Sequence, residues 1–289
     1  MSLDPNTSMQ AVTLAVPNLD RSIRYYTESI GLSLFVRENG QATLGAGSLP
    51  LLHLHEVPGA RPVQRARTGL YHFALLLPSR RDLALVLRHL VEERVPLAGA
   101  SDHGVSEALY LTDPDGHGIE IYRDRPREEW PRDRSGALSM STDPFNAEGV
   151  LAEVTSGRIQ FAGMADGTAM GHVHLHVRNL TEAQTFYCDV LGFDLIQRYG
   201  GQALFVSAGG YHHHLGMNTW AGVGVPPPPE DASRLLLVEI LVPDGASWNG
   251  VRGRLAQAQI PFEDDGHSLL VDDPSQNRLA IRTAPAPAH

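Results

Sequence analysis

An internal repeat constrains the fold of this chain more than any other feature of its sequence. A series of residues recurs 161 positions further along the chain, with no gap between the matching stretches. Such a constant shift indicates two copies of one unit, and 289 residues are enough for each copy to bury a core of its own. The matching positions are Val16 and Val177, Asn18 and Asn179, Leu19 and Leu180, Tyr26 and Tyr187, Gly31 and Gly192, and Gly40-Gln41-Ala42 and Gly201-Gln202-Ala203.

Each copy divides again into two segments of the same design. The first segment is predicted to hold a strand over Ala11–Val16, a helix over Leu19–Ile30 and three strands with Gly-rich turns in Leu32–Glu56. The same order recurs in three further segments, which are Leu70–Tyr122, His172–Asn218 and Leu235–Ile281. The expected fold class is therefore α+β, with four βαβββ modules in curved, mostly antiparallel sheets.

The spacing of the modules divides the chain into three parts. Residues 9–125 are predicted to form the first repeat with modules one and two, and residues 170–284 the second repeat with modules three and four. Residues 126–169 form a linker that is charged and then polar, and its apolar patch Gly149–Val154 predicts one helix. In module four, Gly250 and Gly253 weaken the prediction of a helix near Ser247–Gln259.

Charge and composition exclude several classes of function. Thirty-three acidic and 23 basic residues give a net charge of −10, which argues against a nucleic-acid partner because phosphates require a positive face. No apolar stretch approaches the roughly 20 residues that span a bilayer, and no signal-peptide pattern opens the chain, so a cytoplasmic protein without a membrane partner is expected. The single cysteine, Cys188, excludes a cysteine-built zinc site, whereas 14 histidines suggest other metal ligands.

One candidate site lies between His103 and Glu120. The stretch contains Tyr110 and an Asp-Pro-Asp-Gly turn, and Glu120 lies between Ile119 and Ile121, which point to the opposite face of a predicted strand. A buried carboxylate is costly unless it is paired or binds a metal. A purely structural explanation fits the same residues equally well, namely a turn that leads into a strand whose glutamate lies at the edge of the sheet.

A second candidate site is a strand with three alternating histidines. His172, His174 and His176 share one face of this strand because side chains alternate along it. We expect His174 and His176 to lie on a solvent-exposed polar face. His172 opens the strand, where the rim of a sheet can meet a ligand.

Further histidines occur in a run and singly. His212, His213 and His214 follow two glycines, and the shift of 161 residues maps His214 onto His53. His72 opens the first strand of module two, and a lone histidine on such an apolar strand is more often a satisfied core residue.

Together these motifs resemble the vicinal oxygen chelate superfamily, which contains glyoxalases, bleomycin-resistance proteins and extradiol ring-cleaving dioxygenases. The resemblance rests on the fourfold module, on the motifs that begin at Asn18 and Asn179 before the first helix of each repeat, and on the Asp-Pro-Asp-Gly motif before Glu120 near the end of module two. It covers nearly the whole chain except the linker and tails, and it implies two vicinal-oxygen-chelate domains. The stretch from His103 to Glu120 is similar to the extradiol dioxygenase signature, with a minor departure at Ser101. Among these enzymes, the chain is most similar to bacterial two-repeat catechol-2,3-dioxygenases.

The resemblance implies a metal centre and an activity. His72, His172 and Glu120 match the ligands that hold iron(II) in extradiol enzymes, and the same set of ligands suits manganese(II). The implied reaction inserts dioxygen into a catechol-like substrate, so the expected partners are a small aromatic diol and dioxygen.

The resemblance also implies roles around this metal. Tyr110 would bind the substrate hydroxyl, and His103 would line the pocket. His214 would be the histidine that transfers protons, with His213 as its neighbour.

Two alternatives of the same fold remain open. A metal-dependent glyoxalase-like lyase or isomerase would prefer four protein ligands and would not need Tyr110 or His214. A metal-free, resistance-type protein would bind its ligand without chemistry. The sequence does not identify the catechol or hydroquinone, and only the general frequency of symmetric dimers supports a homo-oligomer.

The distribution of the candidate ligands predicts how the modules pair. His72 and Glu120 lie in module two, and His172 lies in module three. Modules one and four have small or apolar residues at the corresponding places, namely Ala11, Leu237 and Ala280. If module two pairs with module three, all the ligands lie in one cup, the concave side of the paired sheet. We therefore expect one metal site at the two–three pair and a structural one–four pair.

Overall fold

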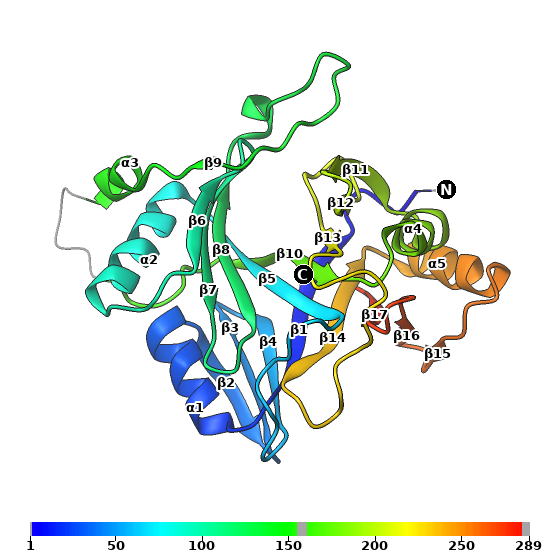
Figure 1. Cartoon of the computed structure of the whole chain (residues 1–289), viewed down its shortest axis with the longest axis horizontal. Coiled ribbons are helices and arrows are strands. Elements are labelled where there is room, and N and C mark those ends of the chain that lie inside the picture. Colours follow the sequence, from blue (N-terminus) through cyan, green and yellow to red (C-terminus); the bar gives the residue numbers. More distant parts are fainter. Residues whose placement is uncertain (1, 155–160, 285–289) are drawn as a thin grey trace.

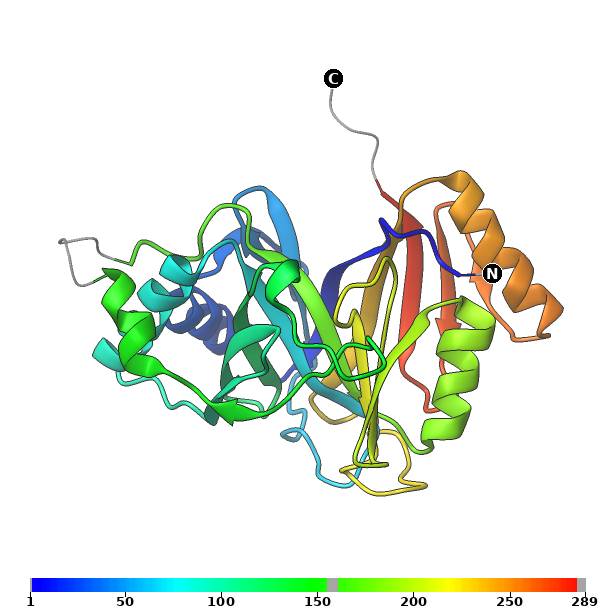
Figure 2. The same cartoon turned by 90° about the horizontal axis from the view of Figure 1, so that it is seen from above.

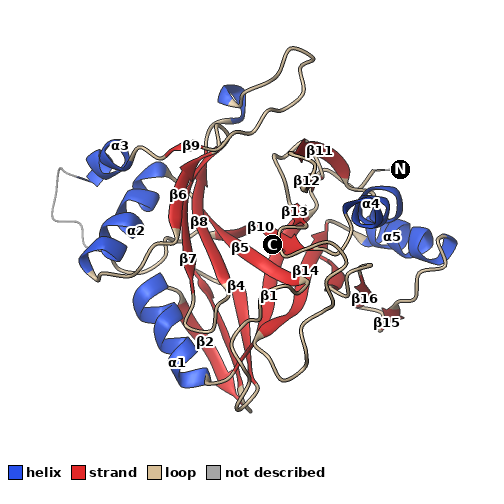
Figure 3. Ribbon diagram, in the orientation of Figure 1, coloured by secondary structure: helices blue, strands red, loops and turns tan. Residues whose placement is uncertain are grey.

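The computed structural model describes residues 2–154 and 161–284. Two curved sheets lie next to each other and carry their helices on the outer flanks (Figures 1 and 3). Seen from above, the helices α1, α2 and α3 cover one flank, and α4 and α5 cover the other (Figure 2). No helix in these described ranges is long and apolar enough to cross a membrane.

The first sheet joins module one to module four. Its eight strands have the order β15-β16-β17-β14-β1-β4-β3-β2, and β1 pairs antiparallel with β14 at its centre. The strands are β1 (Ser8–Val16), β2 (Ser33–Glu38), β3 (Gln41–Ala46), β4 (Leu49–Glu56), β14 (Arg234–Val242), β15 (Glu263–Asp264), β16 (Ser268–Asp272) and β17 (Arg278–Thr283).

The second sheet joins module two to module three. Its nine strands have the order β11-β12-β13-β10-β5-β8-β7-β6-β9, with β5 antiparallel to β10. The strands are β5 (Gly69–Leu77), β6 (Gly99–Asp102), β7 (Ser106–Thr112), β8 (Gly118–Asp124), β9 (Asp143–Pro144), β10 (Ala169–His176), β11 (Asp194–Tyr199), β12 (Ala203–Ser207) and β13 (Leu215–Asn218).

This topology confirms the predicted pairing of module two with three and of module one with four, as well as the α+β class with mostly antiparallel sheets. Each sheet takes one module from each repeat, so the sheets do not follow the division of the chain into residues 9–125 and 170–284. The bounds of the repeats and of the linker stay a prediction about the sequence.

The repeated opening motif forms the same helix in both copies. Asn18 caps α1 (Leu19–Arg24), and Asn179 caps α4 (Leu180–Gln184), each by accepting hydrogen bonds from backbone N–H groups of the first turn. Both helices continue as wider π-helical turns, η1 (Tyr25–Ile30) and η4 (Thr185–Leu191). Gly31 and Gly192 then end them with φ angles of 91° and 94°, a left-handed conformation that favours glycine.

The remaining helices lie in modules two and four and in the linker. They are α2 (Arg80–Glu92), α3 (Ala147–Leu151), α5 (Gly245–Gln257) and the short turns η2 (Arg127–Glu129) and η3 (Ala152–Val154). The helix α5 forms despite its glycines because Asp244 caps it and Val251 and Leu255 are buried against the sheet. The predicted linker helix is present as α3 and η3.

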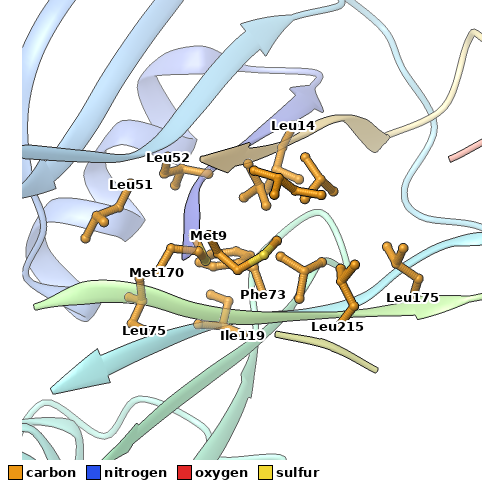
Figure 4. Close-up of a cluster of buried hydrophobic side chains, with 14 of the residues drawn as sticks. Met9, Leu14, Leu51, Leu52, Phe73, Leu75, Ile119, Met170, Leu175 and Leu215 are labelled. Carbon is orange, nitrogen blue, oxygen red and sulfur yellow. The ribbon is translucent and has the colours of Figure 1, made fainter. Parts of the chain in front are cut away.

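The core fills the space between the two sheets. Phe73 and Leu75 on β5 point into the core. Because side chains alternate along a strand, the adjacent His72 and Ala74 point to the opposite face. Buried apolar side chains of both sheets meet in Figure 4, namely Met9, Leu14, Leu51, Leu52, Phe73, Leu75, Ile119, Met170, Leu175 and Leu215. Packing one face of the second sheet in this way leaves its other face to form a cup.

Candidate metal centre

Three neighbouring strands bring the predicted ligands together on the cup face of the second sheet. Ala74 on the central strand β5 is paired with Glu120 on β8 and with His172 on β10. His72 lies two residues before Ala74 and therefore on the same face. Neither histidine opens its strand as expected, because β5 and β10 each begin three residues earlier.

The ligand atoms of these residues converge on one buried point. Glu120 Oε2 lies 3.0 Å from His72 Nε2 and 3.0 Å from His172 Nε2. The three side chains are at most 8% exposed, and their candidate ligand atoms all lie within 4.8 Å of one another. They form the one group of this kind that occurs in residues 2–154 and 161–284.

The chemistry of these donors fits a divalent metal ion. His72 Nε2 is close to the carboxylate but makes no hydrogen bond of acceptable geometry, which leaves a buried ring nitrogen without a partner. A buried carboxylate also needs a compensating charge. A metal ion held by the three side chains would satisfy both requirements.

Burial and mutual proximity prepare the ligands for a metal. Burial lowers the pKa of His172 to about 4, so its imidazole is neutral near pH 7. Burial alone would raise the pKa of Glu120, but its interactions with His172 and His72 hold this pKa well below the usual range. Neutral imidazole and ionised carboxylate are the forms that bind metal ions.

The prediction of an exposed face for His174 and His176 is wrong. His174 is buried and His176 is half-buried, and both line the cavity beside His72. Asn218 holds both rings, since its Nδ2 donates to His174 Nε2 at 3.0 Å and its Oδ1 lies 2.7 Å from His176 Nδ1. The sheet curls, so a face that alternates like a solvated surface becomes the wall of a cup.

Tyr110 and His103 form a fixed pair next to the metal ligands. Tyr110 lies opposite Glu120 in the register of β7 and β8, and its hydroxyl is 2.7 Å from His103 Nε2. His103 Nδ1 lies 2.7 Å from the carbonyl of Ser141 and must donate to it, so the neutral ring accepts the Tyr110 proton at Nε2. Burial, reinforced by Glu120, raises the pKa of Tyr110 well above its usual value and keeps this hydroxyl protonated.

The three consecutive histidines have different surroundings. His213 lines the cavity, and its ring centre is 4.1 Å from that of His172. His214 does not belong to the cavity lining, and its Nδ1 accepts a hydrogen bond from the backbone N–H of Ala208 at 3.2 Å. His212 is fully buried, between His213 and Asp124. This placement does not favour His214 as the histidine that meets the substrate.

A cavity of about 750 Å³ opens in front of the candidate metal ligands. Tyr71, Phe205 and Trp220 add an aromatic wall, which no sequence motif marks because these aromatic residues are isolated along the chain. Met140, Ser141 and Thr142 also line it, although they lie in the predicted linker. The linker therefore forms part of the site, because the backbone N–H of Met140 donates to Gln197 of module three and β9 then pairs with β6.

The other sheet has no such centre. Its residues at the three corresponding places, Ala11, Leu237 and Ala280, offer no ligand atoms. The nearby carboxylate of Glu239 is instead paired with Arg282 at 2.8 Å. Within the described ranges, the candidate ligands gather at the two–three pair.

Comparisons with known proteins agree with this architecture. The family model of the Glyoxalase/Bleomycin resistance protein/Dioxygenase superfamily matches residues 8–121 and 169–281. The chain is 44% identical over 276 residues to the catechol-2,3-dioxygenase of Bacillus subtilis (strain 168), which covers 94% of this chain and 96% of that protein.

Solved structures show the same fold at low sequence identity. A putative dioxygenase from Bacillus subtilis subsp. subtilis str. 168 superposes with a TM-score of 0.65 at 13% identity, covering 99% of this chain and 87% of that one. Glyoxalase I from Zea mays superposes with a TM-score of 0.57 at 16% identity, covering 96% and 92%. With its two matched repeats and a relative that is similar over nearly its whole length, the chain belongs to the Glyoxalase/Bleomycin resistance protein/Dioxygenase superfamily.

Proposed function

We propose that the protein is an iron(II)-dependent extradiol dioxygenase that inserts both atoms of dioxygen into the ring of a catechol-like substrate. The observation that carries the proposal is the convergence of His72, His172 and Glu120 on one buried point beside an open cavity. Two histidines and one carboxylate with open positions are the ligand set of non-heme iron(II) oxygenases. The 44% identical relative is a catechol-2,3-dioxygenase, which supports the same reaction.

His72, His172 and Glu120 would hold the iron. When bound, iron(II) supplies a Lewis acid for the diol oxygens and an electron source for dioxygen. The side chains around it have separate tasks, which are to orient the diol and to accept and return its protons.

Tyr110 is suited to orient the substrate. Its proton is directed to His103, so its oxygen keeps lone pairs that can accept a hydrogen bond from a substrate hydroxyl. The carbonyl of Ser141 fixes this arrangement through the other nitrogen of His103. The aromatic wall of Tyr71, Phe205 and Trp220 offers faces and edges against which an aromatic ring can pack.

His213 is suited to accept a proton from the diol, and its neighbours determine which nitrogen does so. His212 Nε2 lies 2.8 Å from Asp124 Oδ1, and because a carboxylate only accepts, this nitrogen carries a proton. When that is the only proton on the His212 ring, its Nδ1 accepts from His213 Nδ1 at 2.8 Å. His213 Nε2 is then left with a free lone pair.

The surroundings also favour the neutral form of His213. Burial, together with the nearby His172, lowers the pKa of His213 well below its usual value. A neutral imidazole can take a proton from a substrate hydroxyl, and the contact with His212 and Asp124 would stabilise the imidazolium that results. We therefore assign the proton transfer to His213.

The lyase or isomerase alternative has less support. It would prefer four protein ligands, whereas three side chains form the cluster in the described residues. Tyr110 and His213 also have no evident task in that reaction.

Oxygen consumption tests the proposal. Protein prepared without oxygen and loaded with iron(II) should consume one dioxygen per catechol, and both atoms of isotopically labelled dioxygen should appear in a ring-opened semialdehyde. Protein loaded with manganese(II) tests the choice of metal. If the iron-loaded protein binds catechol but consumes no oxygen, the proposal is wrong.

A further inference from the structure

One end of the cavity is built from three segments that are tied together. Residues 63–67 form the first, Gly116 and His117 the second, and residues 233–235 the third. The backbone N–H of Ser233 donates to the carbonyl of Arg61 at 2.7 Å, and the N–H of Val63 donates to the carbonyl of Asp115 at 2.8 Å. These hydrogen bonds hold the three segments side by side.

This end of the cavity is positively charged. Arg65, Arg67 and Arg234 line the cavity, and among the described residues its one acidic lining residue is Glu120 at the candidate metal centre. Such a bias is unexpected in a chain with 33 acidic and 23 basic residues.

Among the described residues these arginine side chains form no ion pair with an acid, although Arg234 lies close enough to Asp231 to help lower the pKa of that carboxyl. Within residues 2–154 and 161–284, Arg65 and Arg67 make no ion pair or side-chain hydrogen bond. Arg234 donates only to backbone carbonyls, those of Glu230 and Ala232. Three guanidinium groups thus keep donors that are free to bind a ligand.

Two buried polar atoms at the same place also lack partners. Ser233 Oγ and His117 Nε2 make no hydrogen bond, although each residue is only 1% exposed. His117 Nδ1 is already engaged by Asp113 at 2.9 Å, which fixes the ring. Buried polar atoms normally have partners, so a polar ligand group is the simplest partner for these two.

The backbone fixes the position of the first two arginines. Ala66 lies between them with a φ angle of 56°, a left-handed conformation that is strained for a residue other than glycine. The segment is held at its end by Thr68, whose N–H donates to the carbonyl of Pro226 and whose hydroxyl donates to the carbonyl of Ser275. A conformation of this kind persists only where its surroundings impose it.

We propose that the substrate carries a negatively charged substituent of the carboxylate class, which binds at Arg65, Arg67, Ser233 and Arg234 while the diol lies at the metal centre. We call these four residues the anion subsite. This inference rests on the proposed function, which places the diol at the metal centre. What it adds is a negative charge at the other end of the substrate. Charge-assisted hydrogen bonds from arginine to a carboxylate are stronger than neutral ones, so they can select such a substrate.

The dimensions fit a short substituent. His117, which lies beside the anion subsite, precedes Glu120 by three residues, or roughly 10 Å of extended chain. A catechol ring with a side chain of a few atoms spans a similar distance. The cavity volume of about 750 Å³ also leaves room for more than an unsubstituted ring.

A pair of probes that differ only in charge tests the inference. We suggest 3,4-dihydroxyphenylacetate and 3,4-dihydroxyphenylacetamide, bound to the metal-loaded protein without oxygen and measured by calorimetry. The carboxylate should bind about tenfold tighter than the amide at low ionic strength, and added salt should reduce this preference. Dihydroxybenzoate and dihydroxyphenylpropionate then report which spacer length fits.

Substitutions locate the preference. Arg67→Gln and the double variant Arg65→Gln/Arg67→Gln should reduce the carboxylate preference to within about threefold of unity. Arg61→Gln is the matched control, since Arg61 lies on the same stretch of chain but pairs with Asp231 outside the cavity lining, and it should keep the preference. Ser233→Ala should lower carboxylate affinity without lowering the melting temperature, because it removes a hydroxyl that has no partner in the protein.

The outcomes separate this inference from the proposed function. Equal binding of acid and amide, or a preference that survives in the double variant, would overturn the anion subsite even if both probes are cleaved. A carboxylate preference that depends on the arginines, without oxygen consumption by either probe, would uphold the subsite and reject the dioxygenase.

Discussion

Glu120 and His172 meet at 3.0 Å across the boundary between the two repeats. Glu120 belongs to the last strand of module two, and His172 belongs to the first strand of module three. Neither repeat therefore contains a complete centre, and the site forms only when β5 and β10 pair. Assembly of the metal ligands thus depends on the same strand pairing that builds the second sheet.

Glu120→Gln should abolish tight metal binding. A neutral amide lacks the anionic charge that offsets the ion, while it can still form hydrogen bonds between the two imidazoles, so the fold should survive. The metal content after purification and reloading, measured by mass spectrometry, should fall at least tenfold. Glu239→Gln is the matched control in the other sheet and should leave the metal content unchanged; equal metal loss in both variants would contradict the assignment.

His213→Phe should retain the metal but slow turnover by about 10²–10⁴-fold, the usual range for a positioned proton-transfer group. His214→Gln keeps an acceptor for the N–H of Ala208 and should change turnover little. Steady-state rates and metal content of both variants check this prediction. If turnover instead requires His214 and not His213, the proton transfer belongs to His214.

Asp124→Asn should reduce turnover through His212. An amide can donate as well as accept, so it no longer fixes the proton on His212 Nε2, and His213 can then lose the tautomer that exposes its Nε2 lone pair. Removing such a supporting partner costs about 10–100-fold in comparable sites. The loss should appear in kcat and in the pH profile of turnover, with KM and metal content retained. An unchanged pH profile would argue against a coupling of Asp124 to His213 through His212.

His214 should make the protein less stable in acid. Burial, followed by the proximity of His212 and His172, lowers the pKa of His214 to about 4, against about 6.5 in the unfolded chain. The unfolded state binds the proton first as the pH falls, so the free energy of unfolding decreases from about pH 6.5 to pH 4, by up to roughly 3 kcal/mol for this residue. Denaturant unfolding of His214→Gln should show a shallower decrease over this range; identical slopes in both proteins would exclude the effect.

Local order was predictable from the sequence because short-range physics determines it. Asn18 and Asn179 cap their helices, and Gly31 and Gly192 end them, with contacts that lie within a few residues along the chain. The alternation of side chains along a strand likewise showed that His172, His174 and His176 share a face. The candidate ligands followed from their matching positions in a resembling family.

Whether such a face is exposed or buried depends on long-range packing. Alternation does not reveal whether a shared face is exposed or concave, so His174 was predicted on the surface and lies in the cup. His213 lines the cavity and the adjacent His214 does not, because the direction of the backbone differs at the two positions. Their adjacency in the sequence does not reveal this difference. Arg67, Met140 and Trp220 reach the cavity from a loop, the linker and the turn after β13, respectively, because distant segments pack around one curved sheet. Local sequence patterns are thus sufficient to predict the modules and their ligand-bearing strands, while long-range packing selects which side chains face the cavity.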